Sequence, residues 1–259
     1  MSLIYLTERK RRVLFAKFAK IAYSDSKTAK AWGKGEGFTA HKFIDKEGAQ
    51  VHIFHNKEDI VVTCRGTEPS EMSDIYADLE VFKEDSVTGA GQIHEGFKEE
   101  VDKVWDLVKD RVNRYDKVNN LSKRIWVTGH SLGGAMATIM ASRLEYYGYD
   151  VHILYTYGSP RAGGPKFRAW CDKHLNHQRF VNNNDVVPCV PTFFRWRHSG
   201  NCNYITSKGE VTNLKRWSSA RVKDKGWSLL KTIVKGRLDI VSDHNIDDYI
   251  LHLEKYNSN

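Results

Sequence analysis

The sequence predicts an α/β fold in which a mostly parallel central sheet is covered by helices on both faces. Short runs rich in β-branched residues alternate along the chain with longer segments of helical periodicity. The run at residues 60–64 is apolar almost throughout, which is typical of a strand buried on both faces. A chain of 259 residues is long enough for one such domain with a sizeable core.

The composition is that of a globular protein, with 41% hydrophobic and 28% charged residues. No apolar run is long enough for a transmembrane helix, and the first nine residues lack the apolar core of a signal peptide. We therefore expect a cytoplasmic or peripheral-membrane protein, which would be secreted only if a leader has been removed. We expect a single domain over residues 1–259.

The net charge of +8 favours anionic partners. No nucleic-acid-binding motif is present, so we expect contact with an anionic membrane surface and not with nucleic acid. Residues 227–238 have a helical pattern with an apolar face that includes Trp227 and a lysine face, which is typical of helices at membrane surfaces. A helix packed on the domain explains the same pattern equally well.

The four cysteines have no metal-binding spacing. Cys64 ends a predicted core strand, where a buried free thiol is expected. Cys189 and Cys202 could approach each other as loop and strand neighbours. A disulfide between them is the less favoured alternative for a chain without an export signal.

The expected elements follow from the hydrophobic periodicity and the turn residues between segments. Residues 195–198 have a further strand-like pattern close behind the last predicted inner strand. In chain order we expect a helix at 7–23, strands at 38–44, 51–55 and 59–64, a helix at 97–112, a strand at 125–128, a helix at 135–141, a strand at 151–157, a helix at 166–173, a strand at 178–182 and a last helix around 249–253.

The stretch from Gly129 to Gly133 is a G-x-S-x-G motif between a predicted strand and a predicted helix. This is the nucleophile turn of α/β-hydrolases, in which the glycines leave room for a sharp turn that exposes the serine hydroxyl. The motif alone arises by chance in about one chain in ten of this length. Its flanks make Ser131 a candidate nucleophile, with the N–H of Leu132 facing a developing oxyanion.

In α/β-hydrolases the acid of the triad follows the nucleophile along the chain. Asp150 precedes its strand and Asp172 lies inside a polar helix, whereas Asp185 comes directly after the predicted strand at 178–182. The acid should lie at the carboxyl end of a strand, where active sites of such sheets are built. This position favours Asp185, although an Asx turn before a proline would give the same local sequence.

Three histidines follow Asp185 and compete for the role of the base. His198 lies close behind the acid, with little chain left to fold over Ser131, and His252 lies in the middle of a helix. His244 occupies a loop just before the last helix, from which an imidazole can reach the ends of the strands. The order along the chain and the loop position favour His244.

The string G-H-S-L-G-G at 129–134 resembles the class 3 lipases, the family of the fungal triacylglycerol lipases. The resemblance covers roughly residues 20 to 255. It includes an N-x-x-D-x-V-P acid loop around Asp185 and a D-H pair at His244, with a tyrosine following at Tyr249. Further similar motifs are R-G-T at 65–67, H-x-G-F at 94–97 and G-x-P-R-x-G at 158–163.

The resemblance also implies roles that the residues alone do not assign. Thr67 would supply an oxyanion donor beside Leu132, and residues 68–80 would form a lid. The lid has no tryptophan, which fungal lipases often carry there, so strong interfacial activation is not implied. Relatives have a similar Ala-Tyr near the rim of their site, which makes Tyr23 a weak site candidate, although a core or edge tyrosine is the favoured interpretation. The basic insertion at 206–238 has no counterpart.

Together these observations predict a serine carboxyl-ester hydrolase that acts on lipid esters through an acyl-enzyme, as a triacylglycerol lipase or esterase. A phospholipase A1 or a lysophospholipase would use the same triad of Ser131, Asp185 and His244. A non-catalytic basic membrane-binding module is the alternative from another class. We expect a monomer with no metal and no organic cofactor.

Overall fold

The computed structural model describes seven stretches of the chain: 2–66, 83–116, 123–183, 185–191, 195–206, 209–214 and 242–257. The expected lid at 68–80, the membrane-surface helix at 227–238 and most of the basic insertion at 206–238 lie outside these residues. Within them, no helix combines the length and the apolar character that are needed to cross a bilayer.

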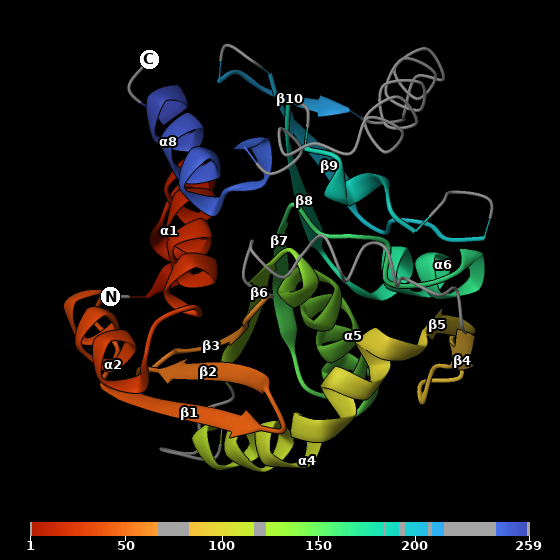
Figure 1. Ribbon diagram of the computed structural model, residues 1–259. Coiled ribbons are helices and arrows are strands. Elements are labelled where there is room, and N and C mark those ends of the chain that lie inside the picture. The colour runs from red at the N-terminus through yellow and green to blue at the C-terminus, as the bar shows by residue number, and fades with distance from the viewer. Residues whose placement is uncertain are drawn as a thin grey trace.

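The described strands form an eight-stranded sheet in the order β1-β2-β3-β6-β7-β8-β9-β10 (Figure 1). The strands from β3 to β9 pair in parallel, and the remaining pairs at both ends are antiparallel. This confirms the mostly parallel sheet. The strands are β1 (Ala40–Lys46), β2 (Ala49–His55), β3 (Asp59–Cys64), β6 (Arg124–His130), β7 (Val151–Tyr157), β8 (His177–Asn182), β9 (Asn201–Ile205) and β10 (Val211–Leu214).

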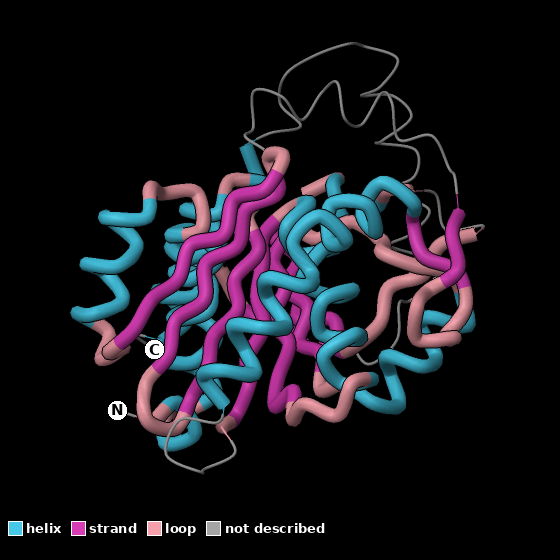
Figure 2. The backbone as a smooth tube through the Cα atoms, turned by 90° about the horizontal axis from the view of Figure 1, so that it is seen from below, coloured by secondary structure: helices cyan, strands magenta, loops and turns pink. Residues whose placement is uncertain are grey.

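Helices lie on both sides of the strand layer (Figure 2). One face is covered by α1 (Glu8–Ile21), α2 (Ser26–Gly35) and α8 (Ile246–Asn257), and the other by α4 (Glu95–Asp116), α5 (Leu132–Tyr146) and α6 (Pro165–His174). Short 3-10 turns occur at Leu3–Tyr5, Val187–Cys189 and Ser242–His244, and β4 (Lys83–Asp85) and β5 (Gln92–His94) form a separate hairpin.

Each face of the sheet has its own hydrophobic core. Because side chains alternate along a strand, Ile60 and Val62 of β3 join the cluster under α4 and α5, whereas Val61 joins the cluster under α1 and α8. Every residue of β3 is buried, which confirms the prediction of a doubly covered central strand. The α1 side is rich in aromatic rings, including Phe15 stacked 4.6 Å from Tyr155.

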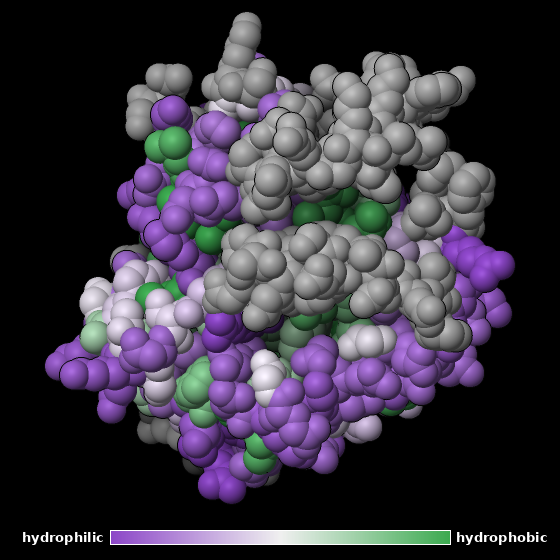
Figure 3. Space-filling view, viewed as in Figure 1, coloured by the Kyte–Doolittle hydropathy of each residue, from purple (hydrophilic) through white to green (hydrophobic). Residues whose placement is uncertain are grey.

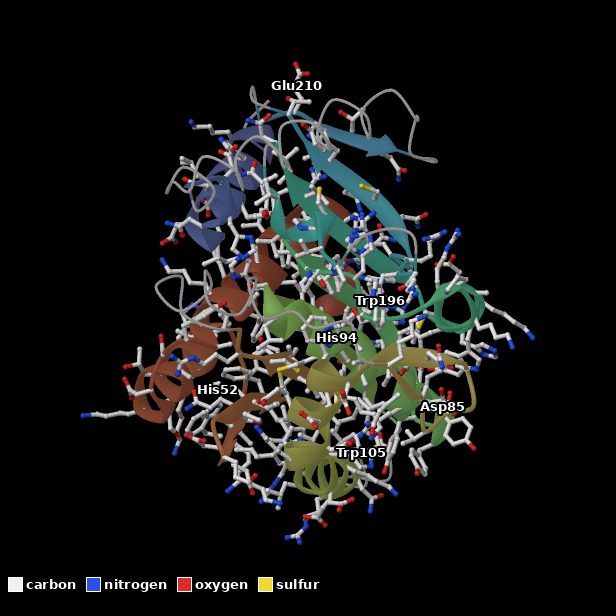
Figure 4. The ribbon with its side chains drawn as sticks, turned by 45° about the vertical axis from the view of Figure 1, so that its right-hand side comes forward. His52, Asp85, His94, Trp105, Trp196 and Glu210 are labelled. Atoms are coloured by element: carbon white, nitrogen blue, oxygen red, sulfur yellow. The ribbon has the colours of Figure 1, made fainter. Side chains whose placement is uncertain are left out.

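One local prediction was wrong. Residues 195–198 do not form a strand, because Arg197 makes only an isolated bridge to Gly163. Trp196 instead packs 5.3 Å from the ring of His94, at the end of the β4–β5 hairpin (Figure 4). The predicted loop before the last helix includes a short 3-10 turn at Ser242–His244. The helix α2 was not expected, and it begins where the carboxylate of Asp25 accepts hydrogen bonds from the first turn.

The cysteines are all free thiols. Cys64 is buried, and this burial raises the pKa of its thiol to about 12, which confirms the expected buried free cysteine. The alternative disulfide between Cys189 and Cys202 is not formed.

Buried neutral histidines predict how stability depends on pH. Desolvation lowers the pKa of His177 to about 3 and of His94 to about 4, well below the 6.5 of an exposed histidine. Below about pH 6.5 the unfolded chain therefore binds protons that the folded chain excludes. We expect the free energy of unfolding to be highest above that pH and to fall by about 1 kcal/mol per pH unit for each such histidine as the pH drops towards 4.

Denaturant unfolding at a series of pH values measures this slope. His177→Gln should make it shallower, because one of the proton-binding differences is removed. An unfolding free energy that does not change between pH 7.5 and 5 would contradict the prediction.

Candidate active site

Ser131 lies in the tight turn between β6 and α5, as the sequence predicts. Its backbone has φ 58° and ψ −132°, a conformation that residues with a side chain rarely adopt. An ideal Cβ on Gly129 would lie 2.1 Å from the carbonyl oxygen of Gly133, so the turn closes only with glycine at this position. Ser131 is 1% exposed and its N–H donates to the carbonyl of Tyr157.

Leu132 is the first residue of α5. The first N–H groups of a helix have no acceptor within the helix, and the helix dipole favours negative charge there. The position of Leu132 therefore suits the predicted oxyanion donor. In Figure 3, most of the coloured residues on this face of the molecule are hydrophilic, and some apolar residues are visible near its centre.

Asp185 and His244 meet at the carboxyl end of the sheet. The Nδ1 of His244 donates to the Oδ2 of Asp185 across 2.9 Å, and both residues are at most 2% exposed. Because Nδ1 carries the proton, Nε2 of the neutral imidazole carries a lone pair. Among the described residues this Nε2 has no hydrogen-bond partner, so it is available to take a proton.

The carboxylate of Asp185 is held by three donors. Besides His244, its Oδ2 accepts the hydroxyl of Tyr249 at 2.5 Å, and its Oδ1 accepts the N–H of Val187 at 2.9 Å. Charge-assisted hydrogen bonds of this kind hold a buried carboxylate in one orientation. The sequence did not assign this role to Tyr249, whose hydroxyl reaches the acid from α8.

The loops that carry the acid and the base are tied together by Asn182, the last residue of β8. Its Nδ2 donates to the carbonyl of Asp243 at 3.0 Å, and its backbone N–H donates to the hydroxyl of Tyr249 at 3.0 Å. Asp185 follows three residues later. The end of β8 thereby positions both members of the pair.

Gly158, directly after β7, is a site residue that the sequence placed in the G-x-P-R-x-G motif without assigning it a role. Its φ is +56°, and an ideal Cβ would lie 2.7 Å from Oδ2 of Asp185 and 2.8 Å from Cε1 of His244. Its backbone passes so close to the pair that no side chain fits. The place of Gly158 after the parallel strand beside the nucleophile strand was the available signal.

Gly158→Ala should therefore separate Asp185 from His244. We expect ester hydrolysis to fall by about 100-fold, because small misplacements of catalytic groups have effects of this size. Gly148→Ala is the matched control: Gly148 also has positive φ, +84°, but a Cβ there meets nothing within 4 Å. Both changes carry about 1–2 kcal/mol of backbone strain. Equal turnover in the two variants would show that the clearance at Gly158 is unimportant.

Thr67, the predicted second oxyanion donor, lies outside the described residues. The chain immediately before it is placed, because an ideal Cβ on Gly66 would lie 3.2 Å from the Cβ of Ser131. The backbone leading to Thr67 thus passes beside the nucleophile turn. The donor role of Thr67 stays a prediction.

The competing histidines are engaged elsewhere. His198 donates from Nε2 to the carbonyl of Pro188 at 2.7 Å, and desolvation lowers its pKa well below the ordinary value. His252, on α8, has its Nδ1 3.0 Å from the side-chain oxygen of Asn182. Of the three candidates, His244 is the one in contact with Asp185.

Comparisons with known proteins agree with this architecture. The family model described as Lipase (class 3) matches residues 61–195, an interval that includes Ser131 and Asp185. His244 lies beyond the matched interval, so its assignment depends on the contact with Asp185.

Two curated relatives illustrate the similarity. The secreted mono- and diacylglycerol lipase 1 of Fusarium solani is 34% identical over 154 residues, which cover 59% of this chain and 45% of the relative. The lipase of Rhizomucor miehei is 29% identical over 202 residues, which cover 74% of this chain and 52% of the relative. The chain thus spans about half the length of these relatives.

Solved structures share the fold. Lipase II from Rhizopus niveus aligns over 92% of both chains with a TM-score of 0.69 and 23% identity, a level that carries information on the fold alone. The lipase from Rhizopus microsporus var. chinensis aligns over 77% of this chain and 76% of its own with a TM-score of 0.61 and 26% identity.

Proposed function

The chain belongs to the class 3 lipase family, and from this membership we propose that it is a serine carboxyl-ester hydrolase acting on lipid esters. The observation that carries the proposal is the buried 2.9 Å hydrogen bond between His244 and Asp185, formed at the same end of the sheet as the turn that presents Ser131. A nucleophile, a base and an acid that orients the base make up the triad of acyl-transfer enzymes.

In the proposed reaction the Oγ of Ser131 attacks the ester carbonyl while Nε2 of His244 takes the hydroxyl proton. The N–H groups of Leu132 and Thr67 stabilise the oxyanion, each contributing about 3–4 kcal/mol in the transition state. The C–O bond to the alcohol then breaks, and His244 returns the proton to the leaving oxygen. His244 then deprotonates a water molecule, which attacks the acyl-enzyme, and returns the proton to the Oγ of Ser131 as the carboxylic acid is released. Asp185 stabilises the imidazolium in both halves of the reaction.

Lipid esters are the proposed substrates because the relatives are named for them: mono- and diacylglycerols in Fusarium solani, and triacylglycerols for a relative from Nicotiana tabacum. A phospholipase A1 or lysophospholipase reaction uses the same catalytic groups. The net charge of +8 supports action at an anionic membrane surface. We also propose that the protein is a monomer and that it is cytoplasmic or peripheral to a membrane.

Turnover of p-nitrophenyl esters of increasing acyl length tests the reaction, and lipid vesicles then test the substrate. We expect hydrolysis of long-chain esters, and faster hydrolysis of a neutral glyceride in anionic vesicles than in zwitterionic vesicles at low salt. High salt should remove this difference, because it screens the protein from the surface. Preferred release of fatty acid from the phospholipids themselves would favour the phospholipase alternative. If no ester is cleaved, the proposal fails, and the alternative of a non-catalytic membrane-binding module is favoured.

A further inference from the structure

His130, at the first of the two variable positions of the G-x-S-x-G motif, lies beneath the turn that carries the predicted base. Alternation along β6 turns Gly129 towards α5 and His130 towards α1 and α8. The side chain is 3% exposed, and its ring centroid lies 4.5 Å from that of His244. The triad chemistry makes no use of this imidazole, so its burial there calls for an explanation.

Both ring nitrogens of His130 have partners. Nε2 lies 2.7 Å from the backbone carbonyl oxygen of His244, and Nδ1 lies 3.0 Å from the hydroxyl of Tyr23. A carbonyl oxygen only accepts, so Nε2 carries the proton and Nδ1 accepts the hydrogen of Tyr23. Desolvation, followed by the nearby His244, lowers the pKa of His130 well below its usual value, so the ring is neutral and has this single tautomer.

The turn at Ser242–His244 offers carbonyl groups that need donors from outside the turn. The carbonyl of Asp243 accepts from Asn182 on β8, and that of His244 accepts from His130 on β6. Two consecutive carbonyls are therefore held by two different strands. Because Ser131 is the residue after His130, the end of β6 presents the nucleophile and also holds the backbone of the base.

Tyr23 explains how the tautomer is maintained. Tyr23 and His130 line a groove of about 660 Å³ between the ends of α1, α2 and α8, together with Trp32 and Ile246. Water entering such a groove could donate to or accept from Nδ1 with equal ease. The hydroxyl of Tyr23 occupies that nitrogen as a donor and thus keeps the proton on Nε2, where it meets His244.

We propose that His130 is a positioning residue that holds the backbone of His244 over Ser131, and that Tyr23 acts through it by fixing the tautomer of its ring. This inference rests on the proposed function, because it concerns the same base. It adds to the triad a chain of two hydrogen bonds that starts at the end of α1 and ends on the carbonyl of the catalytic histidine.

The test compares His130→Phe, which keeps a flat ring but has no donor, with His130→Gln, whose side-chain amide can still donate to the carbonyl of His244. We expect His130→Phe to lower kcat on a soluble short-chain ester by about 10- to 100-fold with KM nearly unchanged, as for other small misplacements of a catalytic group. His130→Gln should recover most of that loss. A purely structural role would not distinguish the two variants in kcat.

Tyr23→Phe should lower kcat less, by about 3- to 10-fold, and should cause no further loss in the His130→Phe background, because the two residues act in series. Tyr155→Phe is the matched control: it removes a buried hydroxyl that bonds to Glu8 on α1, away from the site. His177→Gln is the control for the loss of a buried neutral histidine, bonded here to Thr156 and Ser199. Both controls should change thermal stability and leave kcat within about 2-fold.

The positioning role is overturned if His130→Gln is as slow as His130→Phe, if the two substitutions at Tyr23 and His130 reduce kcat additively, or if the controls lose as much kcat as the His130 variants for the same fall in melting temperature. Ser131→Ala separates these failures from failure of the proposed function. If Ser131→Ala is inactive while the His130 variants are normal, only the positioning role falls. If Ser131→Ala remains active, the proposed function falls with it.

Discussion

Ser131→Ala is expected to remove ester hydrolysis almost completely, lowering kcat by about 10⁴- to 10⁶-fold while the fold is retained. In the proposed reaction the hydroxyl oxygen of Ser131 forms the acyl-enzyme, and alanine has no oxygen to take its place. The backbone conformation at this position, φ 58°, is one that alanine adopts no less readily than serine. The residual rate should come from binding and the oxyanion donors, which survive the substitution.

A serine-reactive organophosphonate provides the direct measurement. Mass spectrometry of the treated protein should place one adduct on Ser131, with no adduct in Ser131→Ala. Ser159 is the matched control, because it is 2% exposed, lies at the same end of the sheet and donates its hydroxyl to the carbonyl of Pro160. Ser159→Ala should label and turn over normally. Labelling of another serine, with turnover intact in Ser131→Ala, would exclude Ser131 as the nucleophile.

The parts of the site that sequence reasoning anticipated are those set by local rules. The strand, the glycine turn and the helix around Ser131 are predicted from residues that lie within about fifteen positions of one another in the sequence. Asp185 is predicted from its place directly after a strand. Parallel strands bring their carboxyl ends to one edge of the sheet, so these two residues are predicted to lie at the same edge. His244 needed the additional argument from chain order and loop position.

The contacts that stabilise the site could not be predicted from the sequence, because they join segments that are far apart along the chain. The bonds of His130 to Tyr23 and to the carbonyl of His244 span 107 and 114 residues. The clearance around Gly158 depends on two loops that arrive later in the chain. The hydrophobic periodicity of the sequence does not predict such contacts, because each contact depends on how three or more elements pack together.

The missed elements were short or weakly patterned. The helix α2 has ten residues, two of which are glycines, and Trp32 is its one large apolar residue, so little in its sequence favours a helix. The strands β4 and β5 have three residues each, too few to show an alternation. In both cases tertiary contacts stabilise what local propensity leaves undecided.

His244→Ala is expected to be as damaging as Ser131→Ala, because triad members act as a unit and the nucleophile is not activated without its base. The double variant should therefore be no slower than either single one. Asp185→Asn should lower kcat by about 10⁴-fold, since an amide that donates to Nδ1 favours the tautomer with its proton on Nε2. In that tautomer the lone pair needed to deprotonate Ser131 is lost.

Two other histidines in the C-terminal part of the chain serve as controls for the assignment of His244 as the base. His198→Ala and His252→Ala remove bonds to the carbonyl of Pro188 and the side chain of Asn182, neither of which carries a proton in the proposed reaction. We expect both variants to lose stability, by about 1–3 kcal/mol for the buried group left unpaired, and to keep kcat within about 3-fold. All variants are assayed with one soluble ester. If His198→Ala is inactive and His244→Ala has normal activity, His198 is the base. The 2.9 Å contact with Asp185 argues for the opposite result, because only a base oriented by the acid can keep its lone pair directed at the nucleophile.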